Sequence, residues 1–247
     1  MLFRSDGSRS KRISQKGKCR ETQVDGLLEK AEAFARGVLE SLEALTGTTA
    51  CKGVQITRLK EWATEKGCWF ESMDELGTFV DRGSENEVYL SKENSQFIYK
   101  LNDFRYSDDN LSPFFFRLKA QQKLFPDCSY TFMGFSMNRE GKVCALLAQR
   151  YILFGREATE DEIHDELLKF GFQPEMGGEY YTNGEFDIFD ASPNNVLVGI
   201  DGGLYFIDTI IYKSDEANLS VYKSQSPKYS KNERSEERRV GKECRSR

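Results

Sequence analysis

The sequence predicts a protein of the α+β class, in which helices and antiparallel strands occupy different parts of the chain. Helical periodicity comes first, over residues 22–66, and short strand-like runs separated by polar turns follow from residue 77. The order of segments lacks the strand–helix–strand rhythm of a doubly wound sheet, and no internal repeat is visible. With 247 residues, the chain suffices for one large domain or two small ones.

Two helices are predicted ahead of the strands. Residues 22–46 place leucine, alanine and valine at helical spacing, and Gly47 is a suitable stop. Residues 55–66 repeat the pattern with Ile56, Leu59 and Trp62 on one face. We therefore expect a helical extension over residues 22–70, and a disordered N-terminus over the basic, aperiodic residues 1–21.

Strands dominate the middle of the chain. Residues 77–79, 87–90 and 97–101 are predicted to form an antiparallel sheet. A helix that begins at Asn110 or Ser112 and runs to Leu124 follows, and Pro126 ends it. Residues 138–142 are the predicted turn of a hairpin, whose second strand is apolar throughout and therefore buried on both faces.

The next segment is a helix with a capping box formed by Thr159 and Glu162. Two strands, 195–200 and 204–211, are then expected to form a hairpin, with Asp201 in its tight turn. Four aspartates and two asparagines lie in this stretch, DIFDASPNNVLVGIDGGLYFIDTIIY, among apolar residues. A carboxylate within an apolar run, such as Asp208, needs a polar partner.

The composition excludes several kinds of site. Six cysteines occur without a CxxC pair, and His164 is the single histidine, which argues against zinc sites and histidine-dependent catalytic triads. No apolar run approaches the length of a membrane helix, and no secretory signal is visible, so a cytoplasmic location without membrane contact is predicted.

The C-terminal tail is treated separately. Residues 216–247 are predicted to be disordered, and residues 234–247 resemble a translated sequencing adapter, so we exclude them from the fold. Without residues 234–247 the chain has 29 basic and 37 acidic residues. This acidic balance disfavours nonspecific binding of nucleic acid.

Asp190, Asn195 and Asp208 are the candidate functional residues of the acidic stretch. Because a hairpin folds back on itself, the ends of its two strands can bring these side chains together. Carboxylate and amide oxygens suit Mg²⁺, which also keeps waters or substrate phosphates. The structural alternative is that Asp190 and Asn195 serve only as turn residues.

The spacing of these residues resembles that of protein kinases. Asp190 and Asn195 have the separation of the catalytic-loop Asp and Asn, and LYFID ends at Asp208 as the strand before a DFG motif does. FIYK places Lys100 at the position of the VAIK lysine, and DRGSENEVYL is similar to a degenerate glycine-rich loop. Residues 77–212 thus resemble a protein kinase-like fold. More narrowly, they resemble the serine/threonine/tyrosine kinase domains of bacterial and phage polyvalent proteins, which belong to mobile genetic elements.

The resemblance implies a bilobal protein, with an antiparallel-sheet N-lobe over residues 71–150 and a shortened C-lobe over 151–215 that contains the catalytic-loop hairpin. ATP and Mg²⁺ are the implied cofactors. The implied catalytic residues are Asp190, which accepts the proton of the acceptor hydroxyl, and Lys100, which holds the α- and β-phosphates. The other implied contacts are Val88 with adenine, Gly83 with phosphates, the main chain at Gln149 with adenine, and Asn195 and Asp208 with Mg²⁺.

Several motif positions depart from the kinase pattern. Ile188 and Phe189 replace His-Arg, Thr209 follows Asp208 in place of Phe, Asn86 stands at the third glycine position, and the 110–124 helix has no glutamate for Lys100. Lys100 could instead be a solvated edge lysine. Three functions therefore stay open: phosphoryl transfer to an unknown protein or small-molecule acceptor, a non-catalytic binding module, and nucleotidyl transfer to a protein.

Overall fold

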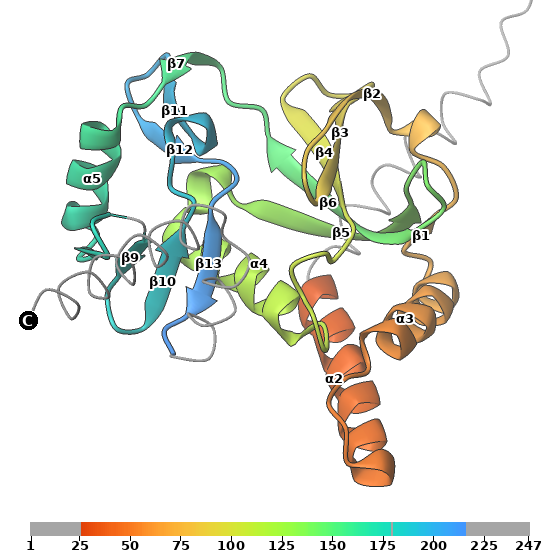
Figure 1. Cartoon of the computed structure of the whole chain (residues 1–247). Coiled ribbons are helices and arrows are strands. Elements are labelled where there is room, and N and C mark those ends of the chain that lie inside the picture. The colour runs from red at the N-terminus through yellow and green to blue at the C-terminus, as the bar shows by residue number, and fades with distance from the viewer. Residues whose placement is uncertain (1–25, 179, 216–247) are drawn as a thin grey trace, which may run out of the picture. The chain divides into compact units, whose positions relative to one another are not determined.

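The computed structural model describes residues 26–178 and 180–215 (Figure 1). The helices are α2 (Leu27–Thr46), α3 (Lys52–Lys66), α4 (Ser112–Leu124) and α5 (Glu160–Lys169), with 3₁₀ turns η1 (Met73–Glu75), η2 (Pro126–Cys128) and η3 (Pro193–Asn195). The strands are β1 (Trp69–Phe70), β2 (Gly77–Arg82), β3 (Asn86–Ser91), β4 (Phe97–Asn102), β5 (Tyr130–Met137), β6 (Val143–Arg150), β7 (Phe154–Glu157), β8 (Gln173–Glu175), β9 (Tyr180–Thr182), β10 (Phe186–Phe189), β11 (Val196–Gly199), β12 (Leu204–Phe206) and β13 (Ile210–Lys213). The α+β class is confirmed.

The chain divides into two compact units. Within the described residues, unit 1 comprises residues 26–157 together with Leu197–Ile207, and unit 2 comprises residues 158–178 and 180–196 together with residues 208–215. The lobe boundary at residue 150, drawn from the kinase resemblance, stays a prediction. The predicted disorder of residues 1–21 and 216–247 lies outside the described residues.

Unit 1 is built on a six-stranded sheet of order β1-β5-β6-β4-β3-β2. Its strands pair antiparallel, except that β1 runs parallel to β5. The predicted hairpin turn over 138–142 is confirmed, because the N–H of Asn138 donates to Lys142 O (2.9 Å). β6 is buried along nearly its whole length, as predicted, since β5 and β4 flank it and apolar groups cover both faces.

Helices cover one face of this sheet, where α2, α3 and α4 pack against β5 (Figure 1). The core on this side includes Trp62, Phe115 and Leu147, while Leu101 and Leu146 contribute to a smaller cluster on the other face. The predicted stop of the first helix is confirmed by the left-handed φ of 70° at Gly47, whose N–H donates to Glu43 O.

A small sheet of order β12-β11-β7 completes unit 1. Asp201 lies in the β11–β12 turn as predicted, where it accepts from the N–H of Gly203 (3.1 Å) and the hydroxyl of Tyr205 (2.6 Å). The expected strand 204–211 is wrong, because β12 ends at Phe206 and β13 begins at Ile210 in another sheet. The carbonyls of Phe206 and Ile207 accept side-chain hydrogen bonds, which interrupts the strand.

Unit 2 contains α5 and a four-stranded sheet of order β13-β10-β9-β8. The predicted capping box is confirmed, because the hydroxyl of Thr159 accepts from the N–H of Glu162 while the Glu162 carboxylate accepts from the N–H of Thr159. All four residues of β10 are buried, and Phe189 stacks on Tyr180 with ring centroids 4.9 Å apart. Across the described residues, every helix is too short or too polar to span a membrane.

Candidate active site

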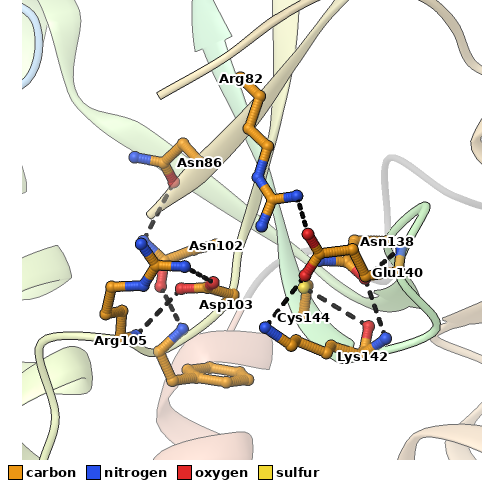
Figure 2. A network of polar contacts seen from close by, with 10 residues as sticks. Arg82, Asn86, Asn102, Asp103, Arg105, Asn138, Glu140, Lys142 and Cys144 are labelled. Carbon is orange, nitrogen blue, oxygen red and sulfur yellow. Dashed lines mark hydrogen bonds and ion pairs between the residues drawn. The ribbon is translucent and has the colours of Figure 1, made fainter. Parts of the chain in front are cut away.

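The β2–β3 turn in unit 1 contains Gly83, the predicted phosphate-contacting residue. Gly83 is exposed, and its N–H donates to Asn86 O (2.8 Å). Asn86 stands at the third glycine position of the kinase pattern, but its side chain is buried and accepts from Asn102 Nδ2 (3.0 Å), as Figure 2 shows. Asn102 Oδ1 in turn accepts from the N–H of Phe104 (3.0 Å). This asparagine pair therefore ties the turn to the end of β4.

Charged side chains beside this turn are paired. Glu85 forms an ion pair with Arg117 of α4, and Glu87 accepts from the hydroxyl of Tyr89 (2.8 Å). Arg82 and Lys142 both contact Glu140 (Figure 2), and their hydrogen bonds lower the pKa of the Glu140 carboxyl to about 2. The acidic groups that the sequence places next to Gly83 are therefore engaged by neighbours within unit 1.

Lys100 lies on β4, an inner strand of the six-stranded sheet, so the alternative of a solvated edge lysine is wrong. Its side chain is 4% exposed, and its backbone is paired with Val88 on β3 and Leu147 on β6. Lys100 Nζ donates to the hydroxyl of Tyr130 (3.0 Å) and to Ile207 O (3.3 Å). The register thus places Val88, the predicted adenine contact, directly opposite Lys100.

Gln149 lies near the end of β6, between β4 and β5. Its side chain is 1% exposed, and its Nε2 donates to Cys128 O (2.7 Å) and to Ile207 O (3.1 Å). The side-chain amide is therefore used within unit 1. A contact between the main chain here and adenine stays a prediction.

The other three predicted site residues belong to unit 2, where Asp190 and Asp208 lie at one end of a strand pair. β10 and β13 are antiparallel, with Phe189 opposite Ile210. Asp190 directly follows β10, and Asp208 lies two residues before β13, so both leave the ladder at the same end. Asp190 is exposed and Asp208 is half-buried.

The loop between β10 and β11 holds Asn195 against Asp190. Asn195 Nδ2 donates to the Asp190 carbonyl (2.9 Å), and Ser192 Oγ donates to Asp190 Oδ1 (3.2 Å). Asp190 has a φ of 55°, in the left-handed region that non-glycine residues seldom occupy. Such strained residues persist where surrounding contacts fix them, and they concentrate at functional sites.

The donor atoms here fit a Mg²⁺ ion in their chemistry. Asn195 Nδ2 donates to the Asp190 carbonyl, while Asn195 Oδ1, which is the metal-ligating type of atom, accepts from Asn194 Nδ2 at 3.4 Å. Asp208 supplies a carboxylate. Next to Asp208, the buried hydroxyl of Thr209 has no hydrogen-bond partner among the described residues. Among the described residues, no three His, Cys, Asp or Glu side chains gather in a group that could hold a metal ion. Bound phosphate oxygens and water would therefore have to complete the ligand shell.

Sequence reasoning missed Tyr130 and Gln121 as neighbours of the candidate site. Gln121, on the helix in which an acidic partner for Lys100 was sought, donates from Nε2 to Phe206 O (3.4 Å). Tyr130 begins β5, and nothing in its local sequence distinguishes it from a packing residue. One feature of the sequence pointed to such neighbours: the 110–124 helix has no acidic residue. A buried lysine without an acidic partner in that helix needs hydrogen-bond acceptors elsewhere.

Comparison with known proteins gives a family. The family described as "Serine/Threonine/Tyrosine Kinase found in polyvalent proteins" matches residues 52–215, which is more than half of the chain. The chain belongs to this kinase family. The match covers α3 through β13, and so includes all seven predicted site residues. No curated protein matches the sequence. Membership supports kinase-like function in general.

Proposed function

We propose that the chain is an ATP- and Mg²⁺-dependent phosphotransferase that moves the γ-phosphoryl group of ATP to a hydroxyl acceptor on a protein or small molecule. The observation that carries this proposal is the β10–β13 register, which puts Asp190 and Asp208 at one end of a strand pair, with Asn195 bonded to the Asp190 carbonyl. In protein kinases an Asp that accepts the hydroxyl proton, and an Asn and an Asp that hold Mg²⁺, are among the parts that phosphoryl transfer uses, which supports the proposal. Family membership supports the same class of reaction.

Each residue has a chemical role in this proposal. Asp190 accepts the proton of the acceptor hydroxyl as that oxygen attacks the γ-phosphorus and the bond to ADP breaks. Lys100 binds the α- and β-phosphates. Val88 and the main chain near Gln149 contact adenine, and the Gly83 turn lies over the phosphates. Asn195 and Asp208 would hold Mg²⁺, which supplies charge stabilisation on the phosphate oxygens.

A second candidate is a non-catalytic module of the same family that binds nucleotide or a partner protein. Two observations favour it. α4 contains no carboxylate for Lys100, and Asn86, at the third glycine position, has its side chain committed to Asn102. Nucleotidyl transfer to a protein is a third possibility, which the α-phosphate label in the test below detects.

The test uses ATP labelled at the γ- or the α-phosphate, with Mg²⁺ and a mixed acceptor lysate. We expect γ-label transfer by the wild-type chain and a loss of roughly 100-fold or more in Asp190→Asn and Asp208→Asn, since a general base or a metal ligand contributes at least that much. Asp201→Asn is the matched control, because Asp201 belongs to the β11–β12 turn.

The alternatives give different results. Transfer of the α-label would identify a nucleotidyltransferase. An ATP-dependent rise in melting temperature without any transfer would identify the binding module. If ATP neither transfers a label nor raises the melting temperature, the phosphotransferase proposal is wrong.

A further inference from the structure

Five side chains of unit 1 converge on two neighbouring carbonyl groups. Ile207 O accepts from Lys100 Nζ (3.3 Å), the hydroxyl of Tyr130 (2.9 Å) and Gln149 Nε2 (3.1 Å). Phe206 O accepts from Gln121 Nε2 (3.4 Å) and Cys128 Sγ (3.4 Å). We call these five side chains and the two carbonyls the carbonyl cluster. Its donors come from β4, α4, η2 and one end of the β5–β6 pair, where Tyr130 lies opposite Gln149.

The cluster is more than ordinary packing. A carbonyl oxygen has two lone pairs, yet three donors lie within hydrogen-bond distance of Ile207 O. Lys100, Gln149 and Gln121 are almost fully buried, and burying such donors is costly unless each is satisfied. Because the Ile207 carbonyl belongs to the peptide group that joins Ile207 to Asp208, the donors fix the orientation of that peptide.

Tyr130 makes two kinds of contact with Lys100. Its hydroxyl accepts from Lys100 Nζ at 3.0 Å, and Nζ also lies 5.1 Å from the centroid of its ring. The same hydroxyl donates to Ile207 O, so one group links the lysine to the carbonyl. A hydroxyl and a carbonyl orient an ammonium group through their dipoles, whereas a helix carboxylate would also cancel its charge.

We propose that Tyr130 and Gln149 are positioning residues for phosphoryl transfer. Tyr130 orients the Lys100 amine in place of an acidic helix residue, and Tyr130 and Gln149 together fix the peptide group ahead of Asp208. This inference rests on the proposed function, since it assigns Lys100 to phosphate and Asp208 to metal. Neither positioning residue touches the reacting atoms.

The test removes single polar atoms and keeps the shape of each side chain. Tyr130→Phe removes the hydroxyl and keeps the ring, and Gln149→Met removes the amide. Tyr99→Phe and Gln122→Met are matched controls: Tyr99 lies beside Lys100 on β4, and exposed Gln122 bonds to the Tyr130 backbone carbonyl (2.9 Å). The first readout is the rate at which acetic anhydride modifies the Lys100 amine, measured by mass spectrometry on the native chain.

We expect Tyr130→Phe to raise the modification rate of Lys100 about tenfold, because Lys100 loses a hydrogen bond to its charged group. Exposed amines such as Lys66 should keep their rates. The second readout is steady-state kinetics. We expect kcat to fall about tenfold in Tyr130→Phe and in Gln149→Met, with a smaller change in KM for ATP, because orientation matters most where charge develops during transfer.

The outcomes separate this inference from the function on which it rests. A wild-type chain that transfers phosphate, with both variants matching their controls in kcat and in Lys100 modification, overturns the positioning role alone. A wild-type chain that neither binds ATP nor transfers phosphate overturns the proposed function, and the positioning role with it. If Gln149→Met fails to fold, Tyr130→Phe decides the question by both readouts.

Discussion

Asp190 shows how the conformation of a single residue can be tied to function. Its φ of 55° is unfavourable for a residue with a Cβ atom, by about 1–2 kcal/mol. The carbonyl of Asp190 accepts from Asn195, and its carboxylate accepts from Ser192, so the loop holds the residue in this conformation. A glycine would satisfy the backbone better but could not accept a proton.

Replacing Asp190 should therefore reverse the usual order of glycine and alanine. Glycine normally lowers stability by about 0.5–1 kcal/mol relative to alanine. At Asp190 we expect Asp190→Gly to exceed Asp190→Ala in the free energy of unfolding by about 1 kcal/mol, because only glycine relieves the positive φ. Urea denaturation measures this difference, and both variants should lack phosphoryl transfer.

Ser192, two residues further along the loop, is the control for this prediction. Its φ is −113°, an ordinary extended value, so Ser192→Ala should be the more stable of its pair with Ser192→Gly. Equal stability of Asp190→Gly and Asp190→Ala would contradict the inference that the backbone at Asp190 is strained.

At the scale of elements, the β1–β5 pair depends on one glycine. Gly134 has a φ of 132°, and a Cβ added to it would lie 2.1 Å from Cys68 O and 3.0 Å from the Cys68 carbonyl carbon. The same Cys68 oxygen accepts from the N–H of Phe135 (3.0 Å). A side chain at position 134 would therefore force β1 away from the bulge in β5.

Gly134→Ala should lower the free energy of unfolding by about 3 kcal/mol, because it combines a backbone clash with a disfavoured φ. Gly141→Ala is the matched control, since Gly141 also has a positive φ of 76° but would meet no atom within 4 Å. We expect the control to cost about 1 kcal/mol. Thermal and urea denaturation measure the stability of both variants. If Gly134→Ala and Gly141→Ala lowered the free energy of unfolding equally, the clash at position 134 would be ruled out.

Much of this element structure could be predicted from the sequence. The predictions of the β5–β6 turn and of the capping box at Thr159 were confirmed, because both features form between residues only a few positions apart. The strand predicted over 204–211 was wrong because donors distant in sequence, such as Lys100, capture the Ile207 carbonyl. β10 was missed because Asp187 interrupts its apolar pattern, although the residue is buried there.

The candidate site was predictable only in part, for the same reason. Residue types and spacing pointed to Lys100, Asp190, Asn195 and Asp208, since motif chemistry is local. Tyr130 could not be found, because its contact with Lys100 spans 30 positions and depends on the register of three strands. Nucleotide and metal binding at these residues stays a prediction.

For the molecule as a whole, buried thiols make the free energy of unfolding depend on pH in the alkaline range. Burial raises the pKa of Cys68 to about 11 and of Cys128 and Cys144 to about 12, from an ordinary value of 9.0. In the unfolded chain these thiols ionise near pH 9, whereas in the folded chain they stay protonated. The contribution of the protonated thiols to the free energy of unfolding is therefore complete below pH 9, and it is lost as the pH rises from 9 toward 12.

We expect the free energy of unfolding, measured by urea denaturation, to be lower at pH 10.5 than at pH 8. The free energy of unfolding of Cys144→Ala should fall less between pH 8 and pH 10.5 than that of the wild-type chain. The substitution removes one thiol whose pKa differs between the folded and the unfolded chain. A wild-type stability that is the same at both pH values would contradict the prediction.

The interrupted path of unit 1 has a consequence for synthesis on the ribosome. Leu197–Ile207 belongs to the same unit as the chain through Glu157, so that unit cannot be completed when residue 157 emerges. The Ile207 carbonyl follows Lys100 by 107 positions. At roughly 5–20 residues per second, translation delivers this acceptor about 5–20 s after the lysine. β6, the last strand of the six-stranded sheet to be made, ends at Arg150, which is 57 positions before Ile207. During the later part of that interval, about 3–11 s at the same rate, the complete nascent sheet holds a lysine at an interior position without the carbonyl that receives it in the finished protein. Binding by a chaperone would protect the chain most in this period.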